Sequence, residues 1–509
     1  MHVARGRLIA FSLALYGVVV ACVALAIWRG TAGHFTYSLD DPYIHLAVAA
    51  QLAHAHYGIN PAEVASPSSS VLWPFLLVPF AGSRIHLYVP LIWNIAAGLV
   101  SATLIACAVS EWPSQSSKGS SRRFVSVAGL LLTANLVGLT FLGMEHGLQV
   151  MLAICCAFGL CRTLSGGPMP LWCVAAAVVA PSVRYEDIAL TFAVGCVLFA
   201  TGRKRLVALM AAASVIPLLV FSLFLHQHGL PMLPVSVLVK GKAVAAHTNA
   251  ASTILRLMGS GIFHALTDST RWPLLLLWLI LTGAAWRERE RVRRLTLGGA
   301  AAAVLLHLLF GRFGWFHRYE VYALIFAALI VLRLLAEDPP QRLGWYALGL
   351  FALAAPYVSA VPDSVFSAED VYHQQFQMHR FATEFFRGNV AVNDLGLVSY
   401  GIGPGRYVLD LGGLASLETA REPHKDATWL ENTVARHHVG LVMIYPGLLP
   451  IPATWVELGT VCNLRPPVAL GGPCVDYYAT TPTDAAALST SFAAFAKTLP
   501  AGAAATSAQ

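Results

Sequence analysis

Charged side chains are scarce in this sequence. Of its 509 residues, 12% are Asp, Glu, Lys or Arg and 57% are hydrophobic, whereas a soluble globular domain carries about 25% charged residues. So few charges cannot cover a protein of this size in water, which excludes a soluble enzyme. A chain this apolar is also not intrinsically disordered. The composition therefore predicts a membrane protein with several spanning segments.

Several sequence motifs of nucleotide and metal chemistry are missing. The chain has no G-x-x-x-x-G-K-[ST] loop, no G-x-G-x-x-G after a predicted strand, and neither the H-E-x-x-H nor the C-x-x-C spacing of zinc sites. These motifs bind phosphates or Zn²⁺ through fixed backbone and side-chain geometry. We therefore expect no use of ATP, no zinc centre and no nucleic-acid partner.

The apolar runs predict an α-helical polytopic membrane protein. A span needs roughly 17–25 apolar residues, and shorter runs can cross inside a bundle. We expect about eleven transmembrane helices, at 8–28, 86–109, 124–142, 147–161, 168–183, 187–201, 206–225, 272–286, 295–311, 320–336 and 343–361. The run 68–82 is broken by Pro74 and Pro79, so we expect it to be re-entrant or juxtamembrane.

The basic residues predict the orientation of the chain. Cytoplasmic loops carry an excess of Lys and Arg. The two densest basic clusters, Arg203–Arg205 and Arg287–Arg294, fall on the same side as the N-terminus. This pattern predicts a cytoplasmic N-terminus and a C-terminus on the outer side. The first run lacks a clear small-x-small cleavage site, so we expect an uncleaved anchor rather than a signal peptide.

The composition divides the chain into three regions. Residues 1–361 are expected to form the transmembrane domain, with its first outer loop at 31–67. Residues 362–483 contain more acids and two strand-like pieces, 390–392 and 439–444, and predict a soluble α/β domain on the outer side. The Ala/Ser/Thr-rich segment 484–509 is a candidate disordered tail. Cys462 and Cys474 lie in the soluble region and are either disulfide-bonded, as an oxidising compartment favours, or two free thiols.

The strongest local feature is an acid pair, Asp40-Asp41, in the first outer loop, followed by Pro42, Tyr43 and His45. One interpretation is a helix N-cap, because Asp followed by Pro is a good helix start. Capping needs only one Asp, however, and adjacent carboxylates repel each other unless a cation or a reaction uses them. The alternative is a general base for an acceptor hydroxyl, or a ligand pair for a divalent cation.

Four further clusters of ionisable residues fall on the predicted outer side, where charges near hydrocarbon need partners. Each has a structural alternative: a solvated loop acid, an ion pair between spans, a snorkelling lysine or an aromatic interface anchor. The functional alternative is a site for a phosphate-bearing substrate. The residues are Glu145 and His146, then Arg184 and Glu186, then Lys240, and finally His317, Arg318 and Tyr319.

These motifs, in this order, resemble the GT-C superfamily of polytopic glycosyltransferases that use polyprenyl-phosphate sugars, in particular its bacterial mannosyltransferase/arabinofuranosyltransferase-like branch. The matching elements are Asp40-Asp41-Pro42-Tyr43-Ile44, Ser66–Trp73, Gly143-Met144-Glu145, Arg184-Tyr185-Glu186, Gly229–Lys240, Arg318-Tyr319 and the 392–414 segment. His146 replaces a small hydroxyl residue of the pattern, and Tyr185 replaces a proline, which puts the identity of the substrate in doubt more than the reaction type.

The resemblance implies an inverting transfer of a sugar from a polyprenyl phosphate to an acceptor hydroxyl on a cell-envelope glycan, lipid or protein. Asp40 or Asp41 would be the base and could hold an optional Mg²⁺, Mn²⁺ or Ca²⁺. The donor phosphate and lipid would contact Arg184, Lys240, His317, Arg318 and Tyr319. The sugar or acceptor pocket would contain Tyr43, His45, Glu145, His146 and Glu186. The expected location is the bacterial cytoplasmic (inner) membrane, with the active site on the periplasmic side.

Two other functions fit part of the sequence. A transporter or flippase of a lipid-linked glycan would share the helical bundle, but should show an internal repeat and broken helices at the membrane midplane. A membrane-anchored scaffold with a glycan-binding outer domain would leave the basic loops before residue 320 unexplained. The order of the motifs favours the glycosyltransferase.

Overall fold

The computed structural model describes residues 2–113, 119–240, 250–337 and 343–507. The chain divides into two compact units, each made of segments that are distant in sequence. The first unit contains the described residues of Met1–Ala24, Leu91–Val220 and Thr248–Pro362, and the second those of Leu25–Pro90, Phe221–His247 and Asp363–Gln509. The sequence predicted consecutive domains instead. Each unit is described below by itself.

Each of the eleven predicted apolar runs contains a helix. The long helices are α1 (His2–Gly30), α4 (Val89–Ser110), α5 (Gly119–Thr133), α6 (Leu136–Leu142), α7 (His146–Leu164), α8 (Leu171–Val183), α9 (Ile188–Ala200), α10 (Lys204–Gln227), α12 (Ala250–Thr267), α13 (Trp272–Arg287), α14 (Arg291–Phe310), α15 (Val321–Leu335) and α16 (Leu343–Val358). Asn135, in the left-handed region with φ 48°, separates α5 from α6.

Seven helical segments in the described ranges are long and apolar enough to cross a membrane. They are Arg5–Gly30, His86–Ser110, Ser120–Leu142, His146–Leu164, Lys204–Gln227, Arg291–Phe310 and Gly344–Phe385, and two shorter apolar helices are Leu171–Val183 and Val321–Leu335. Several such helices indicate a multi-pass membrane protein. The run 68–82 forms only a short helix, α3 (Trp73–Leu77).

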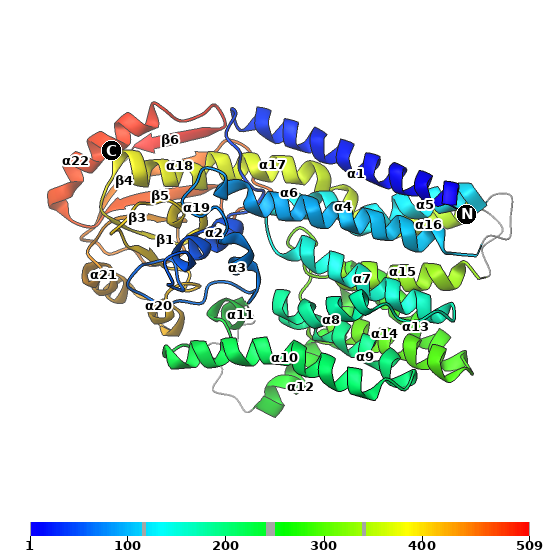
Figure 1. The fold of residues 1–509 in the computed structure, drawn as a ribbon. Helices are drawn as coiled ribbons and strands as arrows, with labels where there is room; N and C mark the ends of the chain where they lie inside the picture. The colour runs from blue at the N-terminus through cyan, green and yellow to red at the C-terminus, as the bar shows by residue number, and fades with distance from the viewer. Residues whose placement is uncertain (1, 114–118, 241–249, 338–342, 508–509) are drawn as a thin grey trace. The chain divides into compact units, whose positions relative to one another are not determined.

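Small residues let the helices of the first unit approach closely. In this unit, α7 packs against α8 and α15, and α14 packs against α9 and α13 (Figure 1). A Cβ added to Gly159 of α7 would lie 2.9 Å from Cys173 Cβ of α8, and one added to Gly299 of α14 would lie 2.8 Å from Cys196 Cβ of α9. Close backbone contact of this kind is how apolar helices gain packing energy where the hydrophobic effect is weak.

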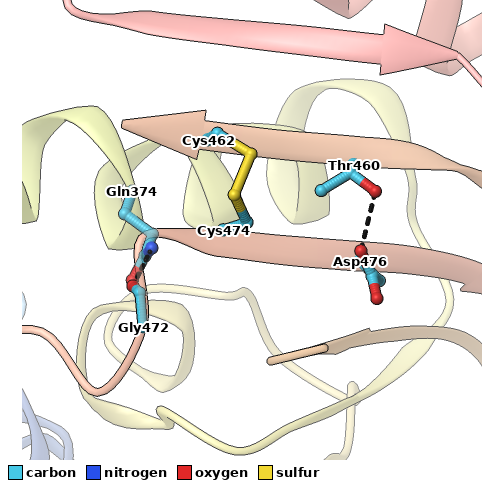
Figure 2. Close-up of a disulfide and its surroundings, with 6 residues drawn as sticks. All are labelled: Gln374, Thr460, Cys462, Gly472, Cys474 and Asp476. Atoms are coloured by element: carbon cyan, nitrogen blue, oxygen red, sulfur yellow. Dashed lines mark hydrogen bonds between the residues drawn. A yellow bond between two sulfur atoms is a disulfide. The ribbon is translucent and has the colours of Figure 1, made fainter. Parts of the chain in front are cut away.

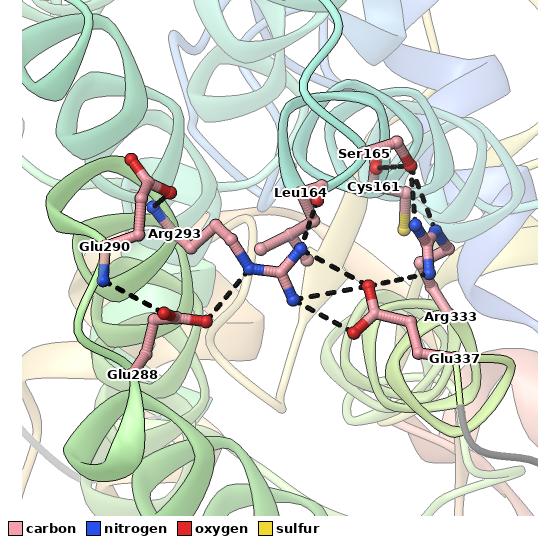
Figure 3. Close-up of polar contacts among 8 residues, drawn as sticks. All are labelled: Cys161, Leu164, Ser165, Glu288, Glu290, Arg293, Arg333 and Glu337. Carbon is pink, nitrogen blue, oxygen red and sulfur yellow. Dashed lines mark hydrogen bonds and ion pairs between the residues drawn. The ribbon is translucent and has the colours of Figure 1, made fainter.

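An ion network joins three of these helices at their ends (Figure 3). Arg293 of α14 pairs with Glu288 at 2.9 Å and with Glu337, beyond α15, at 3.0 Å. Arg333 of α15 pairs with the same Glu337 at 3.1 Å and donates to Ser165, just beyond α7. One carboxylate thus accepts from two guanidinium groups, an arrangement that ties α7, α14 and α15 together.

The second unit contains a mixed six-stranded sheet with shorter helices. Its helices are α2 (Asp41–Leu52), α3, α11 (Val235–Lys240), α18 (Gln375–Arg380), α19 (Gly396–Ser399), α20 (Leu417–Arg421), α21 (Ala427–Arg436) and α22 (Pro482–Ala496), and α17 (Ala360–His373) enters it from the first unit. Its strands are β1 (Asn389–Val392), β2 (Val408–Asp410), β3 (Val439–Ile444), β4 (Val456–Asn463), β5 (Cys474–Ala479) and β6 (Ala503–Ser507). Both strand-like pieces predicted from the sequence are strands.

The strand order is β2-β1-β3-β5-β4-β6. β1 is parallel to both β2 and β3, and the remaining neighbours are antiparallel. The central strands β1 and β3 are almost fully buried, as expected for strands covered on both faces. The first three strands therefore share one edge at which all their carboxyl ends meet.

Helices cover both faces of this sheet (Figure 1). On one face, Leu430 and Val434 of α21 join a cluster with Ala391, Val442 and other strand residues. On the other face, the rings of Phe381, Phe492 and Phe495 surround Tyr477 of β5 at centroid distances of 5.3–6.3 Å. Two covered faces give the unit a core large enough to hold the strand ends in place.

The C-terminal segment differs from the sequence-based expectation of a disordered tail over 484–509. Within it, α22 extends to Ala496, and β6 pairs with β4 in antiparallel register from Gly459↔Ser507 to Asn463↔Ala503. The physical reason is the spacing of Leu488, Phe492 and Phe495, all buried on one side of α22. This i, i+4, i+7 pattern supplies an apolar face despite the Ala/Ser/Thr-rich composition.

A disulfide joins Cys462 of β4 to Cys474 of β5 (Figure 2). The two residues lie directly opposite each other in the β4–β5 hairpin. Nearby, Thr460 donates to Asp476 at 2.7 Å, and Gln374 donates to the Gly472 carbonyl at 2.9 Å. The disulfide thus closes the hairpin at the end from which the 464–473 loop leaves.

Removing this disulfide should lower the stability of the second unit. We expect the double variant Cys462→Ser, Cys474→Ser to lose up to about 3 kcal/mol of unfolding free energy, because the open loop gains entropy in the unfolded chain. Thermal unfolding in detergent measures the loss, and Cys22→Ser, at an exposed free cysteine of α1, is the matched control. An unchanged melting temperature in the double variant would show that the bridge contributes nothing.

Candidate functional site

Asp40, the first acid of the pair, does not cap its own helix. It is the N-cap residue of α2, but its side chain makes no capping hydrogen bond there. Instead its two carboxylate oxygens accept the backbone N–H groups of Gly396, at 2.7 Å, and Leu397, at 2.8 Å. The N-cap alternative from the sequence is therefore wrong for this side chain, which binds a segment 356 residues away.

A third carboxylate, Asp394, belongs to the same unit and follows strand β1. It accepts hydrogen bonds from Gln375 Nε2 at 2.9 Å and from the Tyr445 hydroxyl. The neighbouring Asn393 side chain accepts the Tyr445 N–H at 2.9 Å. Asp40, Asp41 and Asp394 are all half-buried, so each remains partly open to solvent. Asp394 was not among the site residues expected from the sequence.

The electrostatics of these acids favour the protonated form. Burial and the Asp394 carboxylate raise the pKa of Asp40 to about 8, against the opposing effect of the two backbone N–H groups. Burial also raises the pKa of Asp394, as does the charge of Asp41. Carboxyls this close titrate as a group rather than singly, and raised pKa values are a feature of general bases and acids that work near neutral pH.

These donors do not fit a divalent cation at Asp40 and Asp41. Both oxygens of Asp40 already accept backbone N–H groups, and Asp394 accepts from Gln375 and Tyr445, whereas Mg²⁺ and Ca²⁺ need carboxylate oxygens directed at the ion. Among the residues that the structure describes, no group of three His, Cys, Asp or Glu side chains is placed to hold a metal ion. We derive no step through a metal.

Tyr43 and His45, expected in the sugar pocket, lie in the interior of the second unit. Tyr43 is 1% exposed, and its hydroxyl accepts the Tyr37 N–H at 3.1 Å. His45 is 3% exposed on the same helix, α2. Both side chains therefore belong to the core of the unit. Lys240 is the last residue of α11, and its side chain lies outside the described part of the chain.

A second cluster lies in the first unit around Arg184. The guanidinium binds Glu145 at 2.8 Å and Glu186 at 2.7 Å. Glu145 is the N-cap residue of α7, and Arg184 follows α8 in extended conformation. Burial lowers the pKa of Arg184, but the two carboxylates outweigh it and raise the pKa above its ordinary value, so the side chain remains a cation. The structure thus contains the ion pair between Arg184 and Glu186 that was the structural alternative for these residues.

Tyr319 gathers three arginines around one ring. The guanidinium carbons of Arg184, Arg312 and Arg318 lie 5.5, 5.3 and 4.9 Å from its centroid. Arg318 also donates to the Tyr319 hydroxyl at 2.9 Å. These distances suit cation–π contacts. Three guanidinium groups around one ring supply paired N–H donors of the kind that bind anions.

Arg312 is a member of this cluster that the sequence analysis did not select. It is exposed, whereas Arg184 and Arg318 are 8% and 2% exposed. A signal was available, because Arg312 precedes the Arg318-Tyr319 pair within one short aromatic segment. Cations spaced six apart do not share a helix face, however, and only the fold of the loop places both against Tyr319.

The two histidines of the expected site also belong to the first unit. His146, in the first turn of α7, contacts the edge of the Tyr319 ring at 5.5 Å. His317 pairs with Glu320 at 3.0 Å and lies against Tyr357. Trp315, Phe316 and His317 all have φ between 51° and 65°, a left-handed run that costs roughly 1–2 kcal/mol per residue. Strain of this kind is typical of functional loops.

The expected site residues thus form two groups. Asp40, Asp41, Tyr43 and His45 belong to the second unit, as does the backbone of Lys240. Glu145, His146, Arg184, Glu186, His317, Arg318 and Tyr319 belong to the first unit. In the first unit, Glu145, Glu186, His146 and Arg318 are connected through Arg184 and Tyr319.

Comparison with known proteins gives similarities of fold. Residues 368–480 match a family model described as a domain of unknown function (DUF8728). No curated protein sequence matches the chain.

Three solved structures are similar to most of the chain. The apo oligosaccharyltransferase of Archaeoglobus fulgidus is 11% identical, with a TM-score of 0.46, over 84% of this chain and 69% of that one. The same enzyme in complex with Zn and sulfate is 10% identical, with a TM-score of 0.44, over 84% and 67%. ArnT from Cupriavidus metallidurans bound to undecaprenyl phosphate is 11% identical, with a TM-score of 0.46, over 92% and 98%.

Breaking the buried Arg184–Glu145 pair should destabilise the first unit. Glu145→Ala should cost about 3–5 kcal/mol, because it leaves the buried guanidinium with less compensating charge. The matched control is Glu384→Ala, at the exposed Arg380–Glu384 pair, which should cost less than about 1 kcal/mol. Detergent melting curves measure both. Equal losses in the two variants would contradict the assignment of Glu145 as the buried partner of Arg184.

Proposed function

We propose that the protein is a membrane glycosyltransferase of the GT-C type, which transfers a sugar from a polyprenyl-phosphate donor to an acceptor hydroxyl. The observation that carries the proposal is the half-buried acid pair Asp40-Asp41, in which two backbone N–H groups fix the Asp40 carboxylate at the start of the helix that carries Asp41. A base of this kind is what removal of a hydroxyl proton requires. The motif order in the sequence supports the same reaction.

The base is Asp41 in this proposal. Both oxygens of Asp40 accept backbone N–H groups, so Asp40 has a structural use for its carboxylate and Asp41 is the acid of the pair assigned to the acceptor. Asp41 takes the acceptor O–H proton as the oxygen attacks the anomeric carbon. The bond from that carbon to the phosphate oxygen breaks, and the polyprenyl phosphate leaves with the electron pair. A single displacement inverts the anomeric configuration.

The arginine cluster of the first unit is assigned to the donor phosphate. Arg184, Arg312 and Arg318 bring three guanidinium groups to one aromatic ring. Guanidinium groups bind phosphate oxygens through paired N–H donors, and they stabilise the charge that develops on the leaving phosphate. Arg184 and Arg318 are buried and held by side-chain partners. They therefore need little reorganisation during transfer. Lys240 and His317 are further phosphate contacts in this proposal, and His146 and Glu186 flank the sugar.

The orientation, the acceptor and the donor sugar are assigned from the sequence. We place the N-terminus in the cytoplasm and the active site on the periplasmic side of a bacterial inner membrane. The reason is that the two densest basic clusters, Arg203–Arg205 and Arg287–Arg294, fall on the same side as the N-terminus. The acceptor is a cell-envelope glycan, lipid or protein. A mannosyl or arabinofuranosyl donor follows from the branch that the motifs resemble.

Replacing Asp41 should abolish most transfer without unfolding the protein. With purified protein in detergent and a polyprenyl-phosphate sugar, Asp41→Asn should lower kcat by roughly 10²–10⁴-fold, the usual contribution of a general base. Asp484→Asn, at an exposed acid of α22, makes the same charge change and should retain activity. Full activity in Asp41→Asn would remove it from the mechanism. Activity without a membrane gradient would also exclude the transporter alternative.

The transfer rate should rise with pH. The carboxyls have pKa values raised by burial and by each other, so the folded protein keeps them protonated to a higher pH than free aspartate would be. The pair works in its ionised form, and Asp40 gains a proton as the pH falls through about 8, so kcat should fall below that pH and level off above it. A kcat–pH profile measures this. A profile that is flat between about pH 5 and 8 would contradict a base in this setting.

A further inference from the structure

The carboxyl ends of β1 and β3 form a topological switch point. From β1 the chain passes to β2 on one side and later to β3 on the other, and all three strands are parallel. In open α/β sheets, ligands bind at the carboxyl ends of strands where the order reverses in this way, because the two connections leave on opposite faces. The residues that follow these two strands are Asn393, Asp394 and Tyr445.

The first loop of the same chain is bound next to this switch point. Asp40 of the first loop accepts the N–H groups of Gly396 and Leu397, which follow β1 by four and five residues. Ser38 donates to the Ser364 carbonyl at 2.8 Å, and Thr36 donates to the Ala368 carbonyl at 2.8 Å. The loop that leads into the acid pair is therefore fixed by successive contacts with the 364–397 region.

Gly396 is the point of closest approach. A Cβ added there would lie 2.6 Å from Asp40 Oδ2 and would also clash with the Asp40 backbone carbonyl oxygen. Backbone cannot move away as the end of a flexible side chain can, so only glycine fits at this position. The requirement is one of space, since Gly396 is not in the left-handed region.

Asp394 is held in place by its own hydrogen-bond donors. Gln375 of α18 and Tyr445 after β3 both donate to it, and Asn393 fixes the Tyr445 backbone. The groups with a charge effect on Asp40 are Asp41 and Asp394, and Asp40 in turn acts on Tyr43 and Tyr445. Asp394 thus interacts electrostatically with both members of the pair.

We infer that the loop after β1, Asp394–Leu397, positions the acid pair, so that the sheet of the C-terminal segment is part of the catalytic centre. Asp394 and Gly396 are positioning residues: Gly396, with Leu397, fixes the Asp40 carboxylate, which sets the start of α2 and with it Asp41, and Asp394 interacts electrostatically with the pair. The inference rests on the proposed function for its catalytic meaning, and on the hydrogen bonds alone for the docking of the loop.

The docking is tested first by hydrogen exchange, which needs no substrate. Peptides covering residues 394–399 should be protected in the wild-type chain and should exchange about tenfold faster or more in Asp40→Ala, because the acceptor of two N–H groups is gone. Asp484→Ala is the charge-matched control and should leave these peptides unchanged. Equal protection in the wild type and Asp40→Ala overturns the inference, whatever the activity of the protein.

The catalytic meaning is tested by kinetics on the folded protein. Gly396→Ala should lower kcat by about 10²-fold with little change in donor KM, since a displacement of about 1 Å at the reacting groups has that effect. Gly440→Ala in β3, where an added Cβ would meet only the end of the Phe386 ring at 3.0 Å, is the control and should keep near wild-type kcat. Asp394→Asn keeps the shape of the side chain and should lower kcat, again with donor KM retained.

The outcomes separate the two claims. Wild-type kcat in Gly396→Ala or in Asp394→Asn overturns the positioning role while leaving the proposed function intact. No sugar transfer by the wild-type protein, together with loss of protection in Asp40→Ala, overturns the proposed function while the docked loop stands. A loss of folded protein in the glycine variant, seen as a lower melting temperature, leaves the exchange result and Asp394→Asn to decide.

Discussion

The second unit depends on two hydrogen bonds from the backbone of Gly396 and Leu397 to one carboxylate, Asp40. A carboxyl group in a half-buried setting needs hydrogen-bond partners to replace its lost water, and backbone N–H groups at the start of a helical turn supply them. The same bonds fix the first loop on the sheet. The two hydrogen bonds therefore have two effects: they stabilise the Asp40 carboxylate, and they hold an irregular loop in place.

In the first unit, buried arginines likewise need partners that replace their lost water, and here the partners are carboxylates and an aromatic ring. Arg184 stays charged because Glu145 and Glu186 surround it, and Arg318 is covered by the ring and hydroxyl of Tyr319. Burial gives these contacts a strength that surface pairs lack. An arginine held this firmly can meet an anionic group without first being ordered, which is the property that the proposed function assigns to it.

Much of the fold follows from the sequence because its signals are local. Apolar length predicts the helices, and the β-branched runs 390–392 and 439–444 predict β1 and β3. Asp40 and Asp41 stand out because acids are rare in this chain. Their partners do not, because Gly396 and Leu397 contribute backbone groups that every residue carries. Asp394 was missed for a related reason: its relation to Asp40 exists only once β1 and the first loop are brought together.

The second unit is made of three segments that are distant in sequence, and this affects the order in which its contacts can form during synthesis. Residues 25–90 are synthesised before residues 363–509, so Asp40 is made 356 residues ahead of its donor Gly396. During that interval Asp40 has only water and whatever holds the nascent chain to offset its charge. A chain that ends before β1 would carry the acid pair on a loop without its anchor. Assembly of the second unit therefore cannot begin at the acid pair until residues 394–397 have been synthesised.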